Sequence, residues 1–283
     1  MNDSVSIPRL SAPWMVAAFE GWNDAADAAS GVVDHLIDEW EAEVLVEFDP
    51  EEFYDFQVNR PHTHVDDHGD RLLVWPTPTL YRAQPKRGRD VLLLRAPEPN
   101  FRWKAFCSTI IGVASLAGVT ELVTLGALLA DTPHTLPVPV SGSTSDPSLM
   151  ARMALQPSRY NGPVGINSVL ADTASNEGIA TASLWAAVPH YLAEPPCPKA
   201  TLALLGALED AMGFPLPQGV LVEMTDAWQR GAEDVTEHDT DIAEYVEALE
   251  NERETSELPE ASGDAIAREF ERYLRRRGDD PDE

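Results

Sequence analysis

Apolar and polar positions alternate along the chain in blocks that predict strands and helices in turn. The apolar run at 15–19 has the length of a buried strand. The next apolar residues recur every three or four positions, which predicts a helix with one apolar stripe, made of Ala25, Ala28, Ala29, Val32, Val33, Leu36, Ile37 and Trp40. Asn23 or Asp24 is placed to cap that helix. A second strand is predicted at 43–48, and a strand, a helix and a strand in this order are typical of a parallel sheet.

The same alternation continues to residue 188. Further strands are predicted at 71–75, 90–95, 121–130, 164–170 and 181–188. The clearest helix spans 104–117, where Phe106, Ile110, Val113, Ala114 and Ala117 share a face. Gly118 follows it, at the position where helices often end in a glycine. We therefore predict an α/β fold, a three-layer α/β/α sandwich with a mostly parallel sheet.

After residue 198 the pattern becomes helical, with helices predicted at 199–212 and 216–230. Acidic residues at 234–254 surround an apolar stripe of Ile242, Tyr245, Val246 and Leu249, and a last predicted helix carries Ile266, Phe270, Tyr273 and Leu274. We predict an α/β/α core domain at 1–233 and an acidic helical C-terminal extension at 234–283. The stripes of the extension either pack on the core, which we favour, or contact another subunit or a partner.

The charge balance narrows the classes of partner. The chain has 48 Asp and Glu against 20 Lys and Arg, a net charge of -28 at pH 7. Such a field repels nucleic acid and anionic membranes, so we expect neither as a partner. No apolar run approaches the roughly 20 residues of a membrane-spanning helix, and no secretory signal pattern occurs, which favours a cytoplasmic location. Cys107 and Cys197 are too few for a disulfide framework and are expected to be free thiols.

Sequence motifs of familiar catalytic and cofactor sites are absent. The chain has no G-x-x-x-x-G-K-[ST] or G-x-G-x-x-G loop, and the turn after the first strand offers only Gly21 between Glu20 and Asp24, whose charges oppose a phosphate. It has no G-x-S-x-G nucleophile elbow, and the Ser/Gly run at 141–145 is more typical of a loop with a helix cap. Histidines and aspartates gather at 62–68, but a polar hairpin loop is the simpler interpretation. We expect no catalytic residues, no cofactor and no metal site.

Polar residues that follow predicted strands are the remaining candidates for a binding site, because ligands of open α/β sheets bind at strand ends. They are Asn23 and Asp24, then Asp131 and His134, then His190 and Tyr191. An Asp and a His that meet there could perform acid-base chemistry. We favour the other interpretation, in which these side chains cap helices, fill turns or satisfy buried backbone groups.

Four strings in the sequence carry a family resemblance. They lie at 19–25 (FEGWNDA), 55–61 (DFQVNRP), 126–134 (ending in DTPH) and 185–191 (ending in PHY). In this order and spacing they resemble the prokaryotic members of the proteasome assembly chaperone 2 family, over roughly residues 12–230. The candidate binding or motif residues are Gly21, Trp22, Asn23, Asp24, Arg60, Asp131, His134, His190 and Tyr191.

The resemblance implies an α/β/α core similar to that of nucleoside phosphorylases and related hydrolases, and a homo-oligomer, often a trimer. It implies protein partners, with proteasome components among the candidates, and no established reaction. Some relatives dock through a C-terminal tail with a penultimate tyrosine, but this chain ends in DDPDE, so we do not expect that mode. The predicted function is a non-enzymatic protein-binding chaperone or scaffold. The alternative is a small-ligand binder, or a hydrolase- or ligase-type enzyme, that uses the polar groups at the strand ends.

Overall fold

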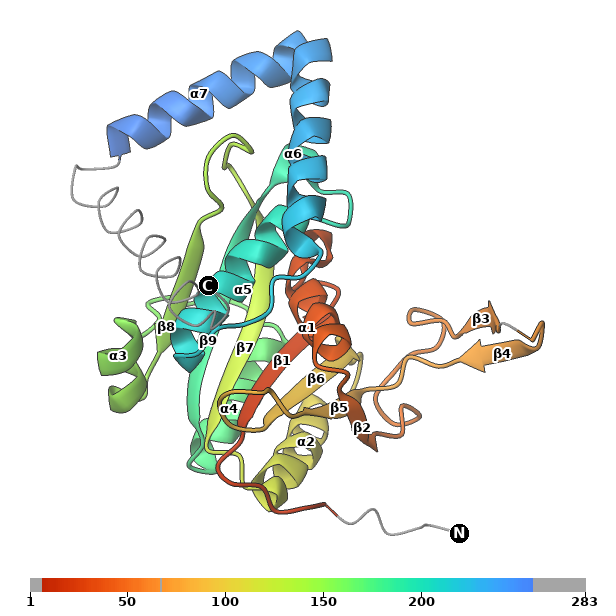
Figure 1. Ribbon diagram of the computed structural model, residues 1–283. Helices are drawn as coiled ribbons and strands as arrows, with labels where there is room; N and C mark the ends of the chain where they lie inside the picture. Colours follow the sequence, from red (N-terminus) through yellow and green to blue (C-terminus); the bar gives the residue numbers. More distant parts are fainter. Residues whose placement is uncertain (1–6, 67, 257–283) are drawn as a thin grey trace, which may run out of the picture.

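A seven-stranded sheet forms the centre of the molecule in the computed structural model, which describes residues 7–66 and 68–256 (Figure 1). In spatial order its strands are β2 (Glu43–Glu47), β5 (Thr79–Ala83), β6 (Val91–Pro97), β1 (Trp14–Glu20), β7 (Glu121–Ala130), β9 (Ala180–Pro189) and β8 (Val140–Thr144). The four central strands β6, β1, β7 and β9 pair in parallel, whereas β5 and β8 run antiparallel to their neighbours. The predicted α/β fold with a mostly parallel sheet is confirmed.

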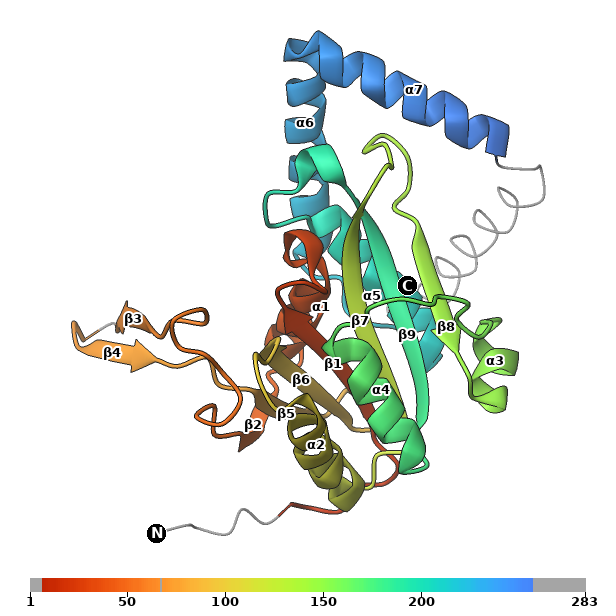
Figure 2. The same ribbon diagram turned by 180° about the vertical axis from the view of Figure 1, so that it is seen from behind.

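Helices cover both faces of this sheet. Helices α1 (Ala28–Glu39) and α5 (Pro198–Met212) pack on one face, and α2 (Trp103–Ala117) and α4 (Ile166–Asn176) lie on the other (Figures 1 and 2). Alternate side chains of β1 point to the two faces of the sheet. Val16 packs in the core under α1 and α5, and Phe19 packs in the core under α2 and α4. A strand that is buried on both faces needs a continuous apolar run, which the central strand has.

The first crossover differs in one respect from a simple parallel unit. β2 pairs with β5, and β5 pairs with β6, in both cases antiparallel. β2 therefore runs parallel to β1, as predicted, but two strands separate them in the sheet.

The strand predicted at 164–170 is wrong, because these residues begin helix α4. Ile166, Leu170 and Ala174 are its buried apolar residues, at helical spacing. A short apolar run fits a strand or a buried helix equally well, and the pattern that decides lies beyond residue 170.

The interpretation of 141–145 as a loop is also wrong in part, since 140–144 forms the edge strand β8. The cap that follows is confirmed: Ser148 and Leu149 donate backbone hydrogen bonds to the Asp146 carboxylate at the start of α3 (Pro147–Met153).

The polar segment around 62–68 belongs to a separate two-stranded hairpin of β3 (His62–Val65) and β4 (Arg71–Val74), which extends away from the sheet (Figure 1). The sequence predicts the strand β4, but it does not predict that β4 lies outside the main sheet. The side chains of both β3 and β4 are exposed. Within the part of the chain that the structure describes, no group of three or more His, Cys, Asp or Glu is placed to hold a metal ion.

The long helices α6 (Leu221–His238) and α7 (Thr240–Ser256) form the C-terminal part of the described chain. Two short 3-10 turns also occur, η1 (Ala25–Asp27) directly before α1 and η2 (His190–Leu192) directly after β9. α6 runs through the predicted domain boundary at 233, and α7 contacts the segments that follow β7 and β9, with Val246 and Leu249 buried. The last predicted helix, with Ile266 and Phe270, lies outside the described residues. Of the helices described, none combines the length and apolar character that a membrane span requires.

Candidate functional site

The turn after β1 is held by Asp24, which caps α1. The backbone N–H groups of Ala29 and Ser30 donate hydrogen bonds of 2.7 Å and 3.1 Å to the Asp24 carboxylate. Asp24 is buried, and burial raises the pKa of its carboxyl group although these hydrogen bonds act in the opposite direction. The predicted N-cap position is wrong, since the residue directly before α1 is Asp27, but the Asp24 side chain makes the capping hydrogen bonds from outside the helix.

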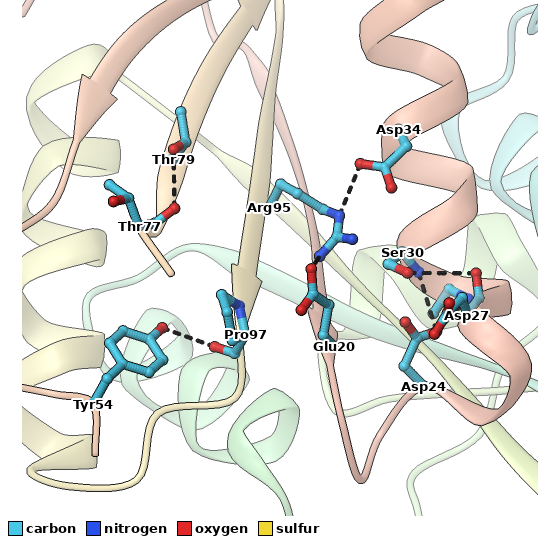
Figure 3. A network of polar contacts seen from close by, with 11 residues as sticks. Glu20, Asp24, Asp27, Ser30, Asp34, Tyr54, Thr77, Thr79, Arg95 and Pro97 are labelled. Atoms are coloured by element: carbon cyan, nitrogen blue, oxygen red, sulfur yellow. Dashed lines mark hydrogen bonds and ion pairs between the residues drawn. The ribbon is translucent and has the colours of Figure 1, made fainter. Parts of the chain in front are cut away.

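Two carboxylates near this turn, those of Glu20 and Asp34, pair with the same arginine. Figure 3 shows the Arg95 guanidinium between the Glu20 and Asp34 carboxylates, at 2.7 Å and 2.8 Å. Because Arg95 comes from β6, Glu20 from β1 and Asp34 from α1, the two ion pairs hold the end of β1 against its neighbours. These acidic groups are therefore part of the scaffold.

Asn23 links the same turn to the start of α4. Its buried side-chain amide donates a hydrogen bond of 2.8 Å to Glu98 Oε1, which also accepts one of 2.9 Å from the Ile166 backbone N–H. The Asn23 carbonyl accepts a hydrogen bond from the Ala127 N–H at 2.8 Å, so the turn is also tied to β7. A carboxylate at a helix N-terminus is favourable, and Glu98 supplies it to α4. Asn23 thus positions two elements that border the cavity described below.

The four candidates after β7 and β9 come together in what we call the strand-end cluster: Asp131, His134, His190 and Tyr191. The Tyr191 hydroxyl accepts a hydrogen bond of 2.8 Å from the His134 backbone N–H and lies 2.9 Å from His134 Nδ1. The hydroxyl of Tyr191 thus binds both the backbone and the ring of His134. His190 Nδ1 lies 3.5 Å from Asp131 Oδ1.

Residues of three helices complete the strand-end cluster. Tyr245 of α7 donates a hydrogen bond of 2.9 Å to Asp131 Oδ1, and its ring packs edge-on against His190 and Tyr191 with centroids 5.3 Å and 5.9 Å away. Lys199 of α5 donates hydrogen bonds to the His134 carbonyl and, at 2.8 Å, to Gln229 of α6.

The protonation states of the cluster suit a structural role. Burial lowers the pKa of His134, and the nearby Lys199 ammonium acts in the same direction. Burial also raises the pKa of Tyr191. At neutral pH the two side chains are therefore uncharged and bound to each other. The geometry favours the interpretation that the strand-end cluster fastens α6 and α7 to the sheet.

Arg60 does not join the other candidates in any contact recorded for the described residues. It is exposed, in the segment that leads into the β3–β4 hairpin on the β2 side of the sheet (Figure 1). β2 and β9 lie on opposite sides of the central strands. The motif residues are thus spread over at least three places.

A cavity of about 910 Å³ lies on the sheet face that carries α4, beside the β1 turn. Ser183 and Trp185 of β9 and Ser141 and Ser143 of β8 line it, and the segment between α3 and α4, which crosses this face in Figure 2, covers part of it. Gly21 and Trp22 are the motif residues in its lining. Strand β9 explains the opening, since its residues on the other face are buried and those on this face are only partly covered.

Large apolar side chains at this cavity are unusually exposed. Among its lining residues, Trp22 is 69% exposed and Tyr160 66%, and Leu128, Leu129 and Val164 are each about half exposed. A contiguous exposed apolar patch is typical of a surface that binds another molecule. The cavity, which the sequence did not predict beyond Gly21 and Trp22, is the candidate functional site.

The comparisons with known proteins agree with this fold. Residues 18–236 match the model of the PAC2 family. The chain is 50% identical to a PAC2 family protein from Streptomyces avermitilis, with a TM-score of 0.77 over 83% of this chain and 99% of that one. It is 45% identical to a proteasome-assembly chaperone homologue from Mycobacterium tuberculosis, with a TM-score of 0.75 over 82% of this chain and 99% of that one.

A more distant structure, an archaeal proteasome activator from Pyrococcus furiosus, shares the fold at 14% identity, with a TM-score of 0.65 over 82% of this chain and 96% of that one. No curated protein matches the chain. The family model covers most of the chain, and two solved structures are 50% and 45% identical to it over more than four fifths of its length, so the resemblance carried by the four strings is confirmed: the chain belongs to the PAC2 family.

Proposed function

We propose that this chain is a protein-binding chaperone or scaffold that works as a homo-oligomer, with proteasome components as the first partners to test. The proposal is supported by membership of the PAC2 family and by similarity to a proteasome-assembly chaperone homologue. A net charge of -28 argues against nucleic acid as a partner. The proposed location is the cytoplasm, which cell fractionation would test.

The observation that carries the proposal is the exposed apolar surface at the cavity, formed by Trp22, Leu128, Tyr160 and Val164. Two copies of a chain with this net charge repel each other. The binding free energy of a contact between copies, or with a partner, is therefore most favourable where the surface carries no charge.

An acid-base enzyme at the strand-end cluster has less support. Asp131, His134, His190 and Tyr191 interact with one another, and Tyr245 of α7 packs against three of them. A substrate would have to replace contacts that already hold α7 in place.

The test is capture of partners from native extract of the source organism. The wild-type chain is compared with a Trp22→Ala, Tyr160→Ala double variant, and with Leu116→Ala as the control, since Leu116 is 64% exposed on α2 and does not line the cavity. We expect proteins retained by the wild type and by the control to be lost from the double variant. The proposal fails if the wild type retains no protein and proteasome assembly is unchanged in cells that lack the chain.

The oligomer is tested separately by sedimentation over a range of concentrations. We expect a homo-oligomer, with a trimer as the first state to fit. A monomer at all concentrations would contradict this part of the proposal without touching the protein-binding part.

A further inference from the structure

We propose that the cavity binds an extended segment of a partner protein that carries an aromatic side chain and no charged group. The inference rests on the proposed protein-binding function and names the chemistry of the partner at that surface. Four properties of the cavity support it: its shape, its lack of charge, its unused hydrogen-bonding groups and its exposed rim.

The floor of the cavity is built to be flat and aromatic. Gly126 of β7 lies opposite Trp185 of β9 in the parallel register, and the indole ring lies across the glycine. A Cβ atom at position 126 would lie 2.6 Å from the ring, so only glycine leaves the indole in this place. The volume of about 910 Å³ is within the range of roughly 300–1,000 Å³ that is usual for binding pockets. An aromatic ring can stack on or meet the edge of such an indole.

The described part of the lining carries no charge. Among the residues at 7–66 and 68–256 that line the cavity, none is Asp, Glu, Lys, Arg or His, although charged residues make up 24% of the chain. A charged ligand group would lose hydration there without gaining a counter-charge, which is costly. The lining therefore selects an uncharged occupant.

Several neutral hydrogen-bonding side chains in the lining make no hydrogen bond to the rest of the described chain. Within the described ranges, no hydrogen bond is recorded for the side chains of Ser141, Ser143, Gln156 or Ser168, all of which line the cavity. By contrast, the Ser183 hydroxyl is 2.7 Å from that of Thr124 and is already paired. Hydroxyl and amide groups donate and accept, as the peptide N–H and C=O groups of an extended segment require.

The rim favours a protein segment over a free small molecule. Trp22, Leu128 and Tyr160 line the cavity but also face solvent, so the apolar surface continues beyond it. The Tyr160 hydroxyl donates a hydrogen bond of 2.9 Å to the Pro163 carbonyl, which fixes the ring at the rim. An occupant that covers this surface has to extend out of the cavity on both sides of its anchoring ring, as a chain segment does.

Short blocked peptides test the inference on the full chain. Acetyl-Ala-Phe-Ala-amide is the neutral aromatic probe. The control peptides replace Phe with Ala, or both Ala with Asp, or both Ala with Lys. Binding is followed by the shifts of the Trp22 and Trp185 indole N–H signals in nuclear magnetic resonance spectra, assigned with Trp→Phe variants.

We expect the neutral aromatic peptide to shift the Trp185 signal to saturation, and each control peptide to bind at least about tenfold more weakly. Ser141→Asp places a carboxylate at the exposed edge of the cavity and should weaken binding of the neutral aromatic peptide. Ser145→Asp adds the same charge four residues away, outside the lining, and should leave binding unchanged. Both positions are exposed, so both variants are expected to fold, which thermal melting would verify.

Several results would overturn the inference. One is an unmoved Trp185 signal with the neutral aromatic peptide. Another is that the Lys peptide binds as tightly as the neutral aromatic peptide, or more tightly, and that this binding disappears in high salt. Such a result would indicate attraction to the net negative charge alone. A third is an equal effect of Ser141→Asp and Ser145→Asp. If the peptides fail while the wild-type chain still captures partners from extract, this inference falls and the proposed function stands.

Discussion

The contact between Gly126 and Trp185 gives the sharpest test of how the cavity is built, through the variant Gly126→Ala. The added Cβ would lie 2.6 Å and 2.7 Å from two ring carbons, Cε3 and Cδ2. Carbon atoms prefer a separation of about 3.5–4.0 Å, so the indole would have to move by roughly 1 Å.

The expected loss of stability follows from this overlap. Overfilling a packed site usually costs about 1–3 kcal/mol. In a domain of this size, each kcal/mol lowers the melting temperature by about 2–4 °C, so we expect a decrease on the order of 2–12 °C. The smaller values apply if the ring moves outward into the cavity, and in that case the Trp185 indole signal has to shift.

Calorimetry and the indole N–H spectrum measure the two effects. The matched control is Gly112→Ala on α2, where no atom lies within 4 Å of the added Cβ, so that melting should be unchanged or slightly higher. In a Trp185→Ala background the ring is absent and Gly126→Ala should cost much less than it does in the wild type. The packing argument is refuted if Gly126→Ala melts like the wild type and leaves the Trp185 signal in place.

Three further predictions follow from the scaffold. The pKa of Asp24 is raised above its ordinary value of 3.8, so the wild type should gain stability relative to Asp24→Asn as the pH falls through the folded-state pKa towards 3.8; a pH-independent difference in urea unfolding would contradict this. Tyr245→Phe removes the hydrogen bond to Asp131 and should speed amide hydrogen exchange in α7 without affecting the sheet, whereas unchanged exchange would mean that the bond does not hold the helix. Burial raises the pKa of Cys107 to about 12, and also that of Cys197, so neither thiol should react with a thiol reagent at neutral pH until the chain unfolds; rapid labelling of the native chain would show that the thiols are accessible.

Sequence patterns predicted the fold best where a strand or helix is buried in one simple way. The strand at 15–19 is covered on both faces and therefore has an unbroken apolar run. β8 is an edge strand with Ser141 and Ser143 facing an open cavity, so it lacks the apolar alternation that would reveal it. The short apolar run around Ile166 fits a strand or a helix, and the helical spacing becomes visible only when Ala174 is included.

The candidate site was predictable only in part, for a topological reason. Because β7 and β9 pair in parallel, residues that follow them meet at one edge, which is why Asp131 and His190 come together. Tyr245 joins them from a helix whose path the local sequence does not reveal. The cavity collects Trp22, Ser141 and Trp185 from three separate strands or turns, and no spacing in the sequence links them.

The central position of β1 also sets an order on biosynthesis. β1 leaves the ribosome before any other strand, but its two neighbours are β6, which begins at Val91, and β7, which begins at Glu121. At least one edge of β1 therefore stays unpaired while about 100 further residues are translated. Unpaired strand edges of this kind promote aggregation. Slow translation, or a truncated message that stops before β7, leaves this buried apolar strand without one of its neighbours.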